Sequence, residues 1–138
     1  GEGGMNAAFA GAHGVPILLA SGDSIFTAQF AGIAPTAVLV TTKVAETPRA
    51  ARLVHPAVVQ QRLADGVGRA LDGRSAARPW HPGTPVNVRL RFADITITQI
   101  LEAIPGVEQV DGYTVAFTAP DMDAAYRMIR LMYRFVSI

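Results

Sequence analysis

The hydrophobic positions in the first half of the chain form short helical stripes separated by continuous apolar runs. Phe9 follows Met5 by four residues, which predicts a short helix that starts near the first residues and ends near Gly14. Residues 15–20 (Val-Pro-Ile-Leu-Leu-Ala) are continuously apolar, which is typical of a strand buried on both faces of a parallel sheet. We expect this strand to stop at residues 21–23 (Ser-Gly-Asp).

A second strand-and-helix pattern follows directly. Phe26 and Phe30 are again four residues apart, and Asp23 is well placed to cap the helix that carries them. Residues 37–40 form another apolar run, so strand, helix and strand predict a βαβ unit. A longer helix is expected to begin at Pro56 and to close at residues 72–73, with an apolar stripe made of Val59, Leu63, Val67 and Ala70.

Strict alternation replaces these runs in the second half. Residues 86–92 alternate between apolar and polar side chains, which predicts a strand with one solvated face. A helix is expected over about 94–104, and a hairpin over 107–118 turns at Asp111-Gly112. The last helix is expected to begin near Asp121, with a stripe made of Met122, Ala125, Tyr126, Ile129, Met132, Tyr133 and Val136.

The predicted fold class is α/β. A βαβ-type parallel layer in the first half is followed by a β-α-β-β-α layer of the α+β kind in the second. Residues 73–85 contain three prolines and resemble a linker or long loop. We therefore expect a boundary that separates 1–74 from a small domain over 75–138.

Composition narrows the possible functions. Half of the 138 residues are hydrophobic and 17% are charged, which favours a packed core over disorder. A net charge of +1 predicts no strong attraction to nucleic acid or to acidic membranes. The sequence has no cysteine, which excludes disulfides and cysteine chemistry and is consistent with a cytoplasmic protein. No apolar run reaches the roughly 18 residues of a membrane-spanning helix.

Four residues are candidates for a functional site. Glu2 lies among three glycines, and because glycine has no Cβ, a ligand or metal can approach the backbone closely there. Asn6 lies one helical turn further on the same face. Asp23 and Lys43 are expected just beyond the carboxyl ends of strands, where α/β proteins bind ligands. The alternatives are a surface glutamate at a frayed terminus, a helix cap at Asp23 and a solvent-facing lysine at a strand end.

The sequence gives little support for other kinds of catalytic or binding site. The sequence has no phosphate-binding Gly-Lys-Ser/Thr loop, and Ser21 and Ser24 lack the setting of a nucleophile elbow. His13, His55 and His81 lack the spacing of metal ligands. The residues by themselves therefore indicate an α/β protein with one unusual carboxylate.

A family resemblance extends, in order, along nearly the whole chain. The residues that carry it are Gly1-Glu2-Gly3-Gly4-Met5-Asn6-Ala7, Gly14-Val15-Pro16, Ser21-Gly22-Asp23, Lys43, His55-Pro56 and 104–115 (Ile-Pro-Gly-Val-Glu-Gln-Val-Asp-Gly-Tyr-Thr-Val). The series resembles the M55 family of D-aminopeptidases. Glu46-Thr47-Pro48 departs from the residues expected there.

The resemblance implies a zinc-dependent aminopeptidase that removes amino-terminal D-amino acids from short peptides and assembles into ring-shaped homo-oligomers. It implies that Glu2 is a metal ligand. Asn6, Asp23 and Lys43 are weaker candidates for residues near that ligand or the substrate. The other ligands and the catalytic histidine would lie upstream, so the chain resembles a carboxyl-terminal half, with 1–74 completing the metal-binding domain. No catalytic residue is expected on this chain.

A catalytic zinc site needs about three protein ligands. We therefore expect the isolated chain to bind zinc weakly and to hydrolyse nothing without the upstream half. The missing half would also leave the first sheet with an uncovered edge, so that association is expected. The alternative is a non-catalytic oligomerisation or ligand-binding module with the same fold.

Overall fold

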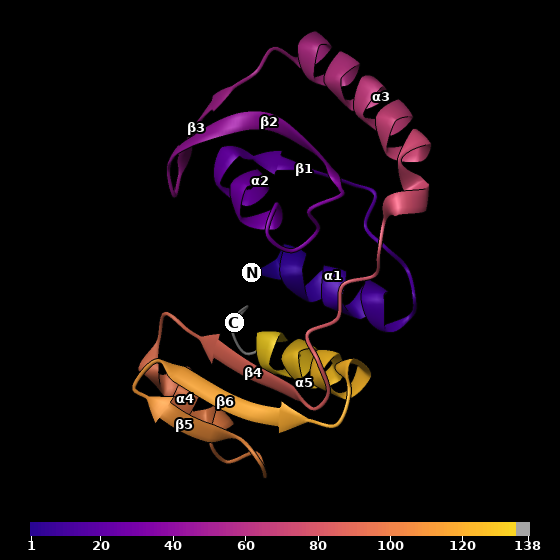
Figure 1. Cartoon of the computed structure of the whole chain (residues 1–138). Coiled ribbons are helices and arrows are strands. Elements are labelled where there is room, and N and C mark those ends of the chain that lie inside the picture. Colours follow the sequence, from indigo (N-terminus) through magenta and orange to yellow (C-terminus); the bar gives the residue numbers. More distant parts are fainter. Residues whose placement is uncertain (135–138) are drawn as a thin grey trace. The chain divides into compact units, whose positions relative to one another are not determined.

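Two three-stranded sheets organise the part of the chain that the computed structural model describes, residues 1–134 (Figure 1). One sheet belongs to the unit Gly1–His81 and the other to the unit Pro82–Ile138. Position 136 of the predicted final stripe lies outside the described residues. The assignment of 1–74 and 75–138 to separate domains stays a prediction. None of the helices in residues 1–134 combines the length and the hydrophobicity of a membrane-spanning segment.

The first unit contains the predicted βαβ arrangement. Its sheet has the order β1-β2-β3, with β1 and β2 parallel and β2 and β3 antiparallel. The elements are α1 (Glu2–Ala12), β1 (Leu19–Asp23), α2 (Ser24–Phe30), β2 (Val38–Thr47), β3 (Ala50–Leu53), α3 (Pro56–Asp72) and a short 3₁₀ helix, η1 (Arg74–Ala76).

Helices cover both faces of this sheet, and α2 and α3 lie on opposite sides of it in Figure 1. Ala20 packs against the buried cluster around Phe30, where α1 and α2 meet. The next residue toward the amino terminus, Leu19, lies instead beside Gly66 of α3. Because successive strand residues point to opposite faces, α1 and α2 cover one face and α3 covers the other.

The first strand lies further along the chain than the apolar run predicts. Residues 15–18 are not in a strand, and pairing with β2 starts at Leu19 and continues to Asp23. The Val15 N–H closes the end of α1 on Ala10 O at 2.9 Å, and Pro16 has no N–H to donate. Ser21 and Gly22 can still pair because the ladder is made by backbone groups. The predicted bounds of this strand are therefore wrong, although its parallel pairing is confirmed.

The second unit has the predicted β-α-β-β-α order. Its antiparallel sheet has the order β4-β6-β5. The elements are β4 (Val86–Arg91), α4 (Ile95–Leu101), β5 (Glu108–Asp111), β6 (Thr114–Ala119) and α5 (Met122–Arg134). The fold class predicted from the sequence is thus confirmed in both halves.

One face of the second sheet is covered by its helices and the other is open. Val115 of β6, Leu101 of α4 and Met132 of α5 are fully buried on the covered face. The buried Thr98 hydroxyl lies 2.9 Å from Gly112 O and accepts a 2.8 Å hydrogen bond from Gln109 Nε2. In Figure 1, α4 lies behind β6, and the open face is turned to the viewer. The alternation over 86–91 therefore separates a core face from a solvated one.

Candidate functional site

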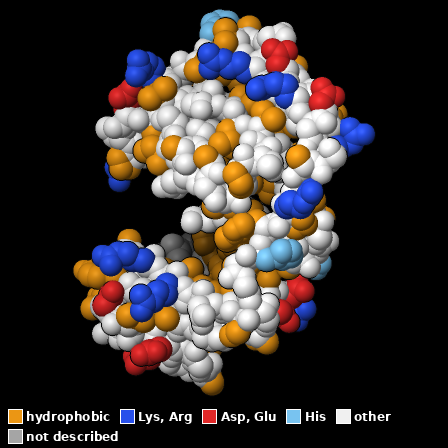
Figure 2. Space-filling view, viewed as in Figure 1, with side chains coloured by type: hydrophobic (Ala, Val, Ile, Leu, Met, Phe, Trp, Pro, Cys, Tyr) orange, Lys and Arg blue, Asp and Glu red, His pale blue; other side chains and the backbone are white. Residues whose placement is uncertain are grey.

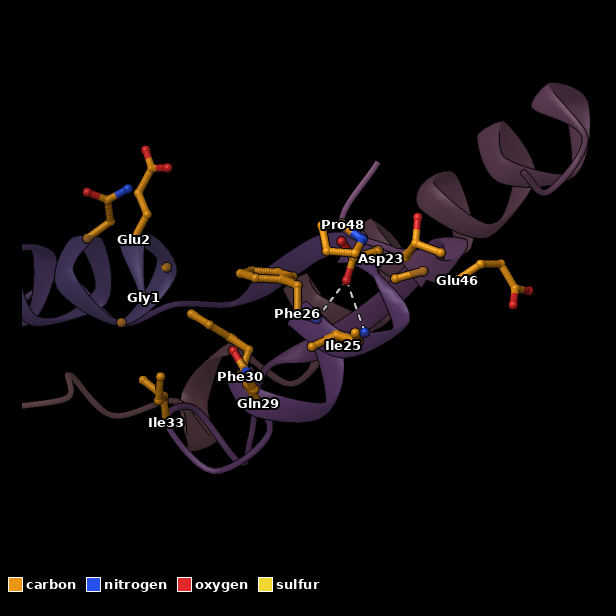
Figure 3. A pocket seen from close by; sticks show the side chains of 15 residues that line it. Gly1, Glu2, Asp23, Ile25, Phe26, Gln29, Phe30, Ile33, Glu46 and Pro48 are labelled. Atoms are coloured by element: carbon orange, nitrogen blue, oxygen red, sulfur yellow. Dashed lines mark hydrogen bonds between the residues drawn. The ribbon is translucent and has the colours of Figure 1, made fainter. Parts of the chain in front are cut away.

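A pocket of ≈ 770 Å³ lies in the first unit, where the first turn of α1 approaches α2 and the β2–β3 hairpin. In Figure 3, Glu2 lies at one end of this pocket, Asp23 and Glu46 lie toward the other end, and Phe26 lies between them. The lining residues are Gly1, Glu2, Gly3, Gly4, Asn6, Asp23, Ile25, Phe26, Gln29, Phe30, Ile33, Ala45, Glu46, Thr47 and Pro48.

Glu2 is the first residue of α1, and its side chain is exposed. Its position in the first turn places a negative charge where the helix dipole favours it. Asn6 follows one turn later on the same face and is also exposed at the pocket. The structure therefore brings Glu2 and Asn6 together, as the spacing predicts. A carboxylate and an amide on one helix face can coordinate a cation or hydrogen-bond a polar ligand.

Glycines from two separate motifs make room for the Phe26 ring. A Cβ on Gly3 would lie 2.6 Å from Phe26 Cε2, and a Cβ on Gly22 would lie 2.5 Å from Phe26 Cδ1. The ring also stacks on Phe30, with the centroids 5.2 Å apart. The glycine beside Glu2 thus has a packing role, because it lets α1 approach α2 closely enough to place Glu2 at the pocket.

Asp23 has the helix-capping role that the sequence left as an alternative. Its Oδ1 accepts hydrogen bonds from the backbone N–H of Ile25 at 3.0 Å and of Phe26 at 2.8 Å. Asp23 also lines the pocket, at the end of β1. The cap fixes the start of α2, and with it the direction in which Phe26 leaves the helix.

The sequence predicted that Lys43 lies just past the end of a strand, but the structure places it within one. Strand β2 continues to Thr47, and Lys43 pairs with Asp23 on one side and with Leu53 on the other. It is exposed and is not among the residues that line the pocket. The predicted position of Lys43 is wrong because β2 extends beyond the end of β1, its parallel partner, and then forms a hairpin with β3.

Sequence reasoning missed the part of the pocket wall that the hairpin supplies. Glu46, Thr47 and Pro48 line the pocket, and Glu46 forms an exposed ion pair with Arg52 at 3.0 Å. All four residues of β3 are exposed, so the sequence has no alternation of hydrophobic and polar positions that would predict this strand. The one available signal was the departure of this triplet from the residues expected in the resembling family.

Comparison with known proteins assigns the family. A model of the M55 peptidases, described as D-aminopeptidase, matches residues 1–131. The chain belongs to the M55 family of D-aminopeptidases. A D-aminopeptidase from Bacillus subtilis (strain 168) is 28% identical over 133 residues, which cover 96% of this chain and 48% of that protein.

A solved structure gives the same assignment for this M55 chain. The zinc-dependent D-aminopeptidase DppA from Bacillus subtilis, described as a self-compartmentalizing protease, matches with a TM-score of 0.90 and 27% identity. The match covers 97% of this chain and 49% of that one. The chain therefore spans about half the length of the relatives it matches.

The metal-ligand side chains in the described part of this M55 chain are scattered rather than clustered. Residues 1–134 contain no group of three or more histidine, cysteine, aspartate or glutamate side chains placed to hold a metal ion. His55 Nδ1 accepts a hydrogen bond from the Ala57 N–H and caps α3, and His13 lies edge-on to Phe9 with ring centroids 4.9 Å apart. Neither histidine therefore belongs to a group of metal-ligand type within the described residues, and Glu2 stays a predicted ligand.

Proposed function

We propose that this chain is one half of a zinc-dependent aminopeptidase that removes amino-terminal D-amino acids from short peptides. The family match over residues 1–131 is the observation that carries the proposal. The zinc dependence named for the matched Bacillus subtilis structure supports it further. Because the chain spans only half of its relatives, the activity belongs to the complete protein.

Glu2 is the proposed metal ligand of this half. Its carboxylate is exposed at the pocket, so it remains available to a metal ion held partly by residues outside the chain. The remaining ligands and the catalytic histidine are proposed to come from the upstream half. Zinc in such a site would supply Lewis-acid activation for peptide hydrolysis.

The neighbours of Glu2 have proposed supporting roles. Asn6 lies on the same face of α1 and would orient the Glu2 carboxylate or a polar group of the peptide. Asp23 already caps α2 through Oδ1, so it would act on the site mainly by positioning that helix. Lys43 is the weakest of the candidates, because it is outside the pocket lining.

The complete protein is proposed to assemble into a ring of identical subunits. The self-compartmentalizing description of the matched structure supports this part of the proposal. Within the described residues, β1 forms an edge of its sheet, because only β2 pairs with it. Unpaired backbone groups along a buried-type strand favour the addition of another strand, and we propose that the upstream half supplies it.

Hydrolysis of a D-alanyl dipeptide by the complete protein tests the proposal. The wild-type protein should release D-alanine, the Glu2→Ala variant should not, and chain 1–138 by itself should not. Glu46→Ala is the matched control, because Glu46 is also an exposed carboxylate at the pocket but is paired with Arg52. Full activity in Glu2→Ala, or hydrolysis by the isolated chain, would refute the assignment of Glu2 and of the split site.

A non-catalytic binding or oligomerisation module is the second candidate. The lack of a three-ligand group within residues 1–134 is expected of such a module as well as of a half-site. Zinc content measured together with the mass of the assembly separates the two. A metal-bound complex with the upstream half supports the peptidase, whereas a metal-free oligomer of the complete protein supports the module.

A further inference from the structure

The open face of the β4-β6-β5 sheet carries opposite charges on its two outer strands. Arg89 of β4 pairs with Ala116 of β6, and Glu108 of β5 pairs with the same alanine from the other side. Directly paired residues point to the same face of an antiparallel sheet. Arg89 and Glu108 are both exposed, and blue and red side chains both lie on this unit's visible face in Figure 2.

The second row of the same face repeats this order of charges. Arg91 of β4 and Asp111 of β5 both pair with Thr114 of β6. These two charges have roles within the unit, because Asp111 Oδ1 accepts the Tyr113 N–H at 2.8 Å and the Arg91 guanidinium lies 5.5 Å from the centre of the Tyr113 ring. Positive charge thus follows β4 and negative charge follows β5.

Arg89 and Glu108 differ from Arg91 and Asp111 because their charged groups have no partner within residues 1–134. Within residues 1–134, neither side chain takes part in a hydrogen bond or an ion pair. The small side chain of Ala116 lies between them, and the strand on which it lies is the central one. Because the Ala116 side chain is short, another protein surface can approach the sheet closely between Arg89 and Glu108.

We propose that this face binds the same face of a second copy of the chain, about a two-fold axis that runs parallel to β6. Rotation about that axis places β4 of each copy over β5 of the other. Arg89 then meets Glu108 of the second copy, twice, and Ala116 meets its own symmetry mate. A two-fold axis across the strands would instead place arginine over arginine, so the charges select one orientation.

This contact is one of several in the assembly proposed above. A face of three short strands is small, so we expect a weak contact that associates measurably at high concentration and is reinforced by the other contacts of the complete assembly. The contact rests on the self-association proposed above and does not depend on zinc. Loss of the contact therefore appears in the assembly mass, whereas failure of the proposed function appears in peptide hydrolysis.

Charge reversal tests the contact in chain 1–138 and in the complete protein. Sedimentation velocity over a range of concentrations at low salt measures the dissociation constant of wild type, Arg89→Glu, Glu108→Arg and the double variant. Each single reversal should weaken association about tenfold or more, because it acts twice about the axis. The double variant should restore it. Added salt should weaken the wild-type contact.

Arg127→Glu is the matched control. Arg127 is exposed on α5, which packs on the opposite face of the sheet, and the charge change is the same. It should leave the dissociation constant unchanged, and circular dichroism should show all variants folded. The proposal is overturned if wild type is monomeric throughout, if the single reversals associate like wild type, or if the double variant stays as weak as the single ones.

Discussion

Gly3→Ala tests how the pocket is built around Phe26. Alanine at this position gains at most about 1 kcal/mol of helix propensity in the first turn of α1. Its Cβ, however, would lie 2.6 Å from Phe26 Cε2 and 3.2 Å from Phe30 Cδ2. The Phe26 ring has little room to move aside, because it also lies close to Gly22, where an added Cβ would lie 2.5 Å from Phe26 Cδ1.

The clash should exceed the gain in propensity. Overpacking of this kind costs about 1–3 kcal/mol, so we expect a net loss of about 1–2 kcal/mol in the free energy of unfolding of the first unit. Gly68→Ala is the matched control, because Gly68 lies inside α3 with open space around its Cβ position. That variant should be stabilised by about 0.5–1 kcal/mol.

Urea unfolding followed by tryptophan fluorescence measures both variants. Trp80 is the single tryptophan of the sequence, and it packs against the core cluster of the first unit. With an m-value of about 2 kcal/mol/M, the midpoints of the two variants should differ by about 1 M. Addition of Phe26→Leu to Gly3→Ala should cost less than the sum of the single changes. A Gly3→Ala midpoint equal to or above that of Gly68→Ala would show that the Phe26 ring is not confined by its neighbours.

Three further predictions concern stability. Gly11→Ala should cost about 3 kcal/mol in the same titration, because its Cβ would meet the main-chain carbonyl of Trp80; a wild-type midpoint would contradict this. Asp23→Ala should cost about 1 kcal/mol by removing the α2 cap, and Asp23→Asn much less; equal thermal stability of the two variants would argue against the cap. Backbone hydrogen bonds from Thr96 and Tyr113 lower the pKa of Asp94 and of Asp111. The unfolded chain therefore takes up these protons first, so the stability that both carboxylates contribute is present above about pH 4 and is lost as the pH falls through their folded pKa values. Asn at either position should flatten that loss in an acid titration followed by circular dichroism, and an unchanged slope would contradict the cause.

The second unit could be predicted almost entirely because its signals are local. Alternation over residues 86–91 names the core face of β4, and the Asp111-Gly112 turn fixes the β5–β6 hairpin. The first unit was harder, because β1 is defined by backbone pairing rather than by its apolar run. Strand β3 could not be found at all, since its four side chains are exposed and carry no alternation.

In the candidate site, too, the features that depend on local sequence could be predicted and those that depend on distant contacts could not. Glu2 and Asn6 share a helix face, which follows from spacing alone. The packing role of Gly3 could not be predicted, because Phe26 reaches it only once α1 lies against α2. The contribution of Glu46 depends on how far β2 extends beyond β1. Each miss therefore concerns a contact between segments that are distant in the sequence.

The zinc content of the complete protein shows whether Glu2 is a metal ligand of a site that two halves share. Wild type, Glu2→Ala and Glu46→Ala would be dialysed against the same buffered zinc concentration, and the bound metal would be measured per subunit. If Glu2 is a ligand of a split site, wild type and Glu46→Ala should retain equal zinc, and Glu2→Ala should lose it while keeping its fold. Wild-type zinc content in Glu2→Ala would show that Glu2 is not a ligand.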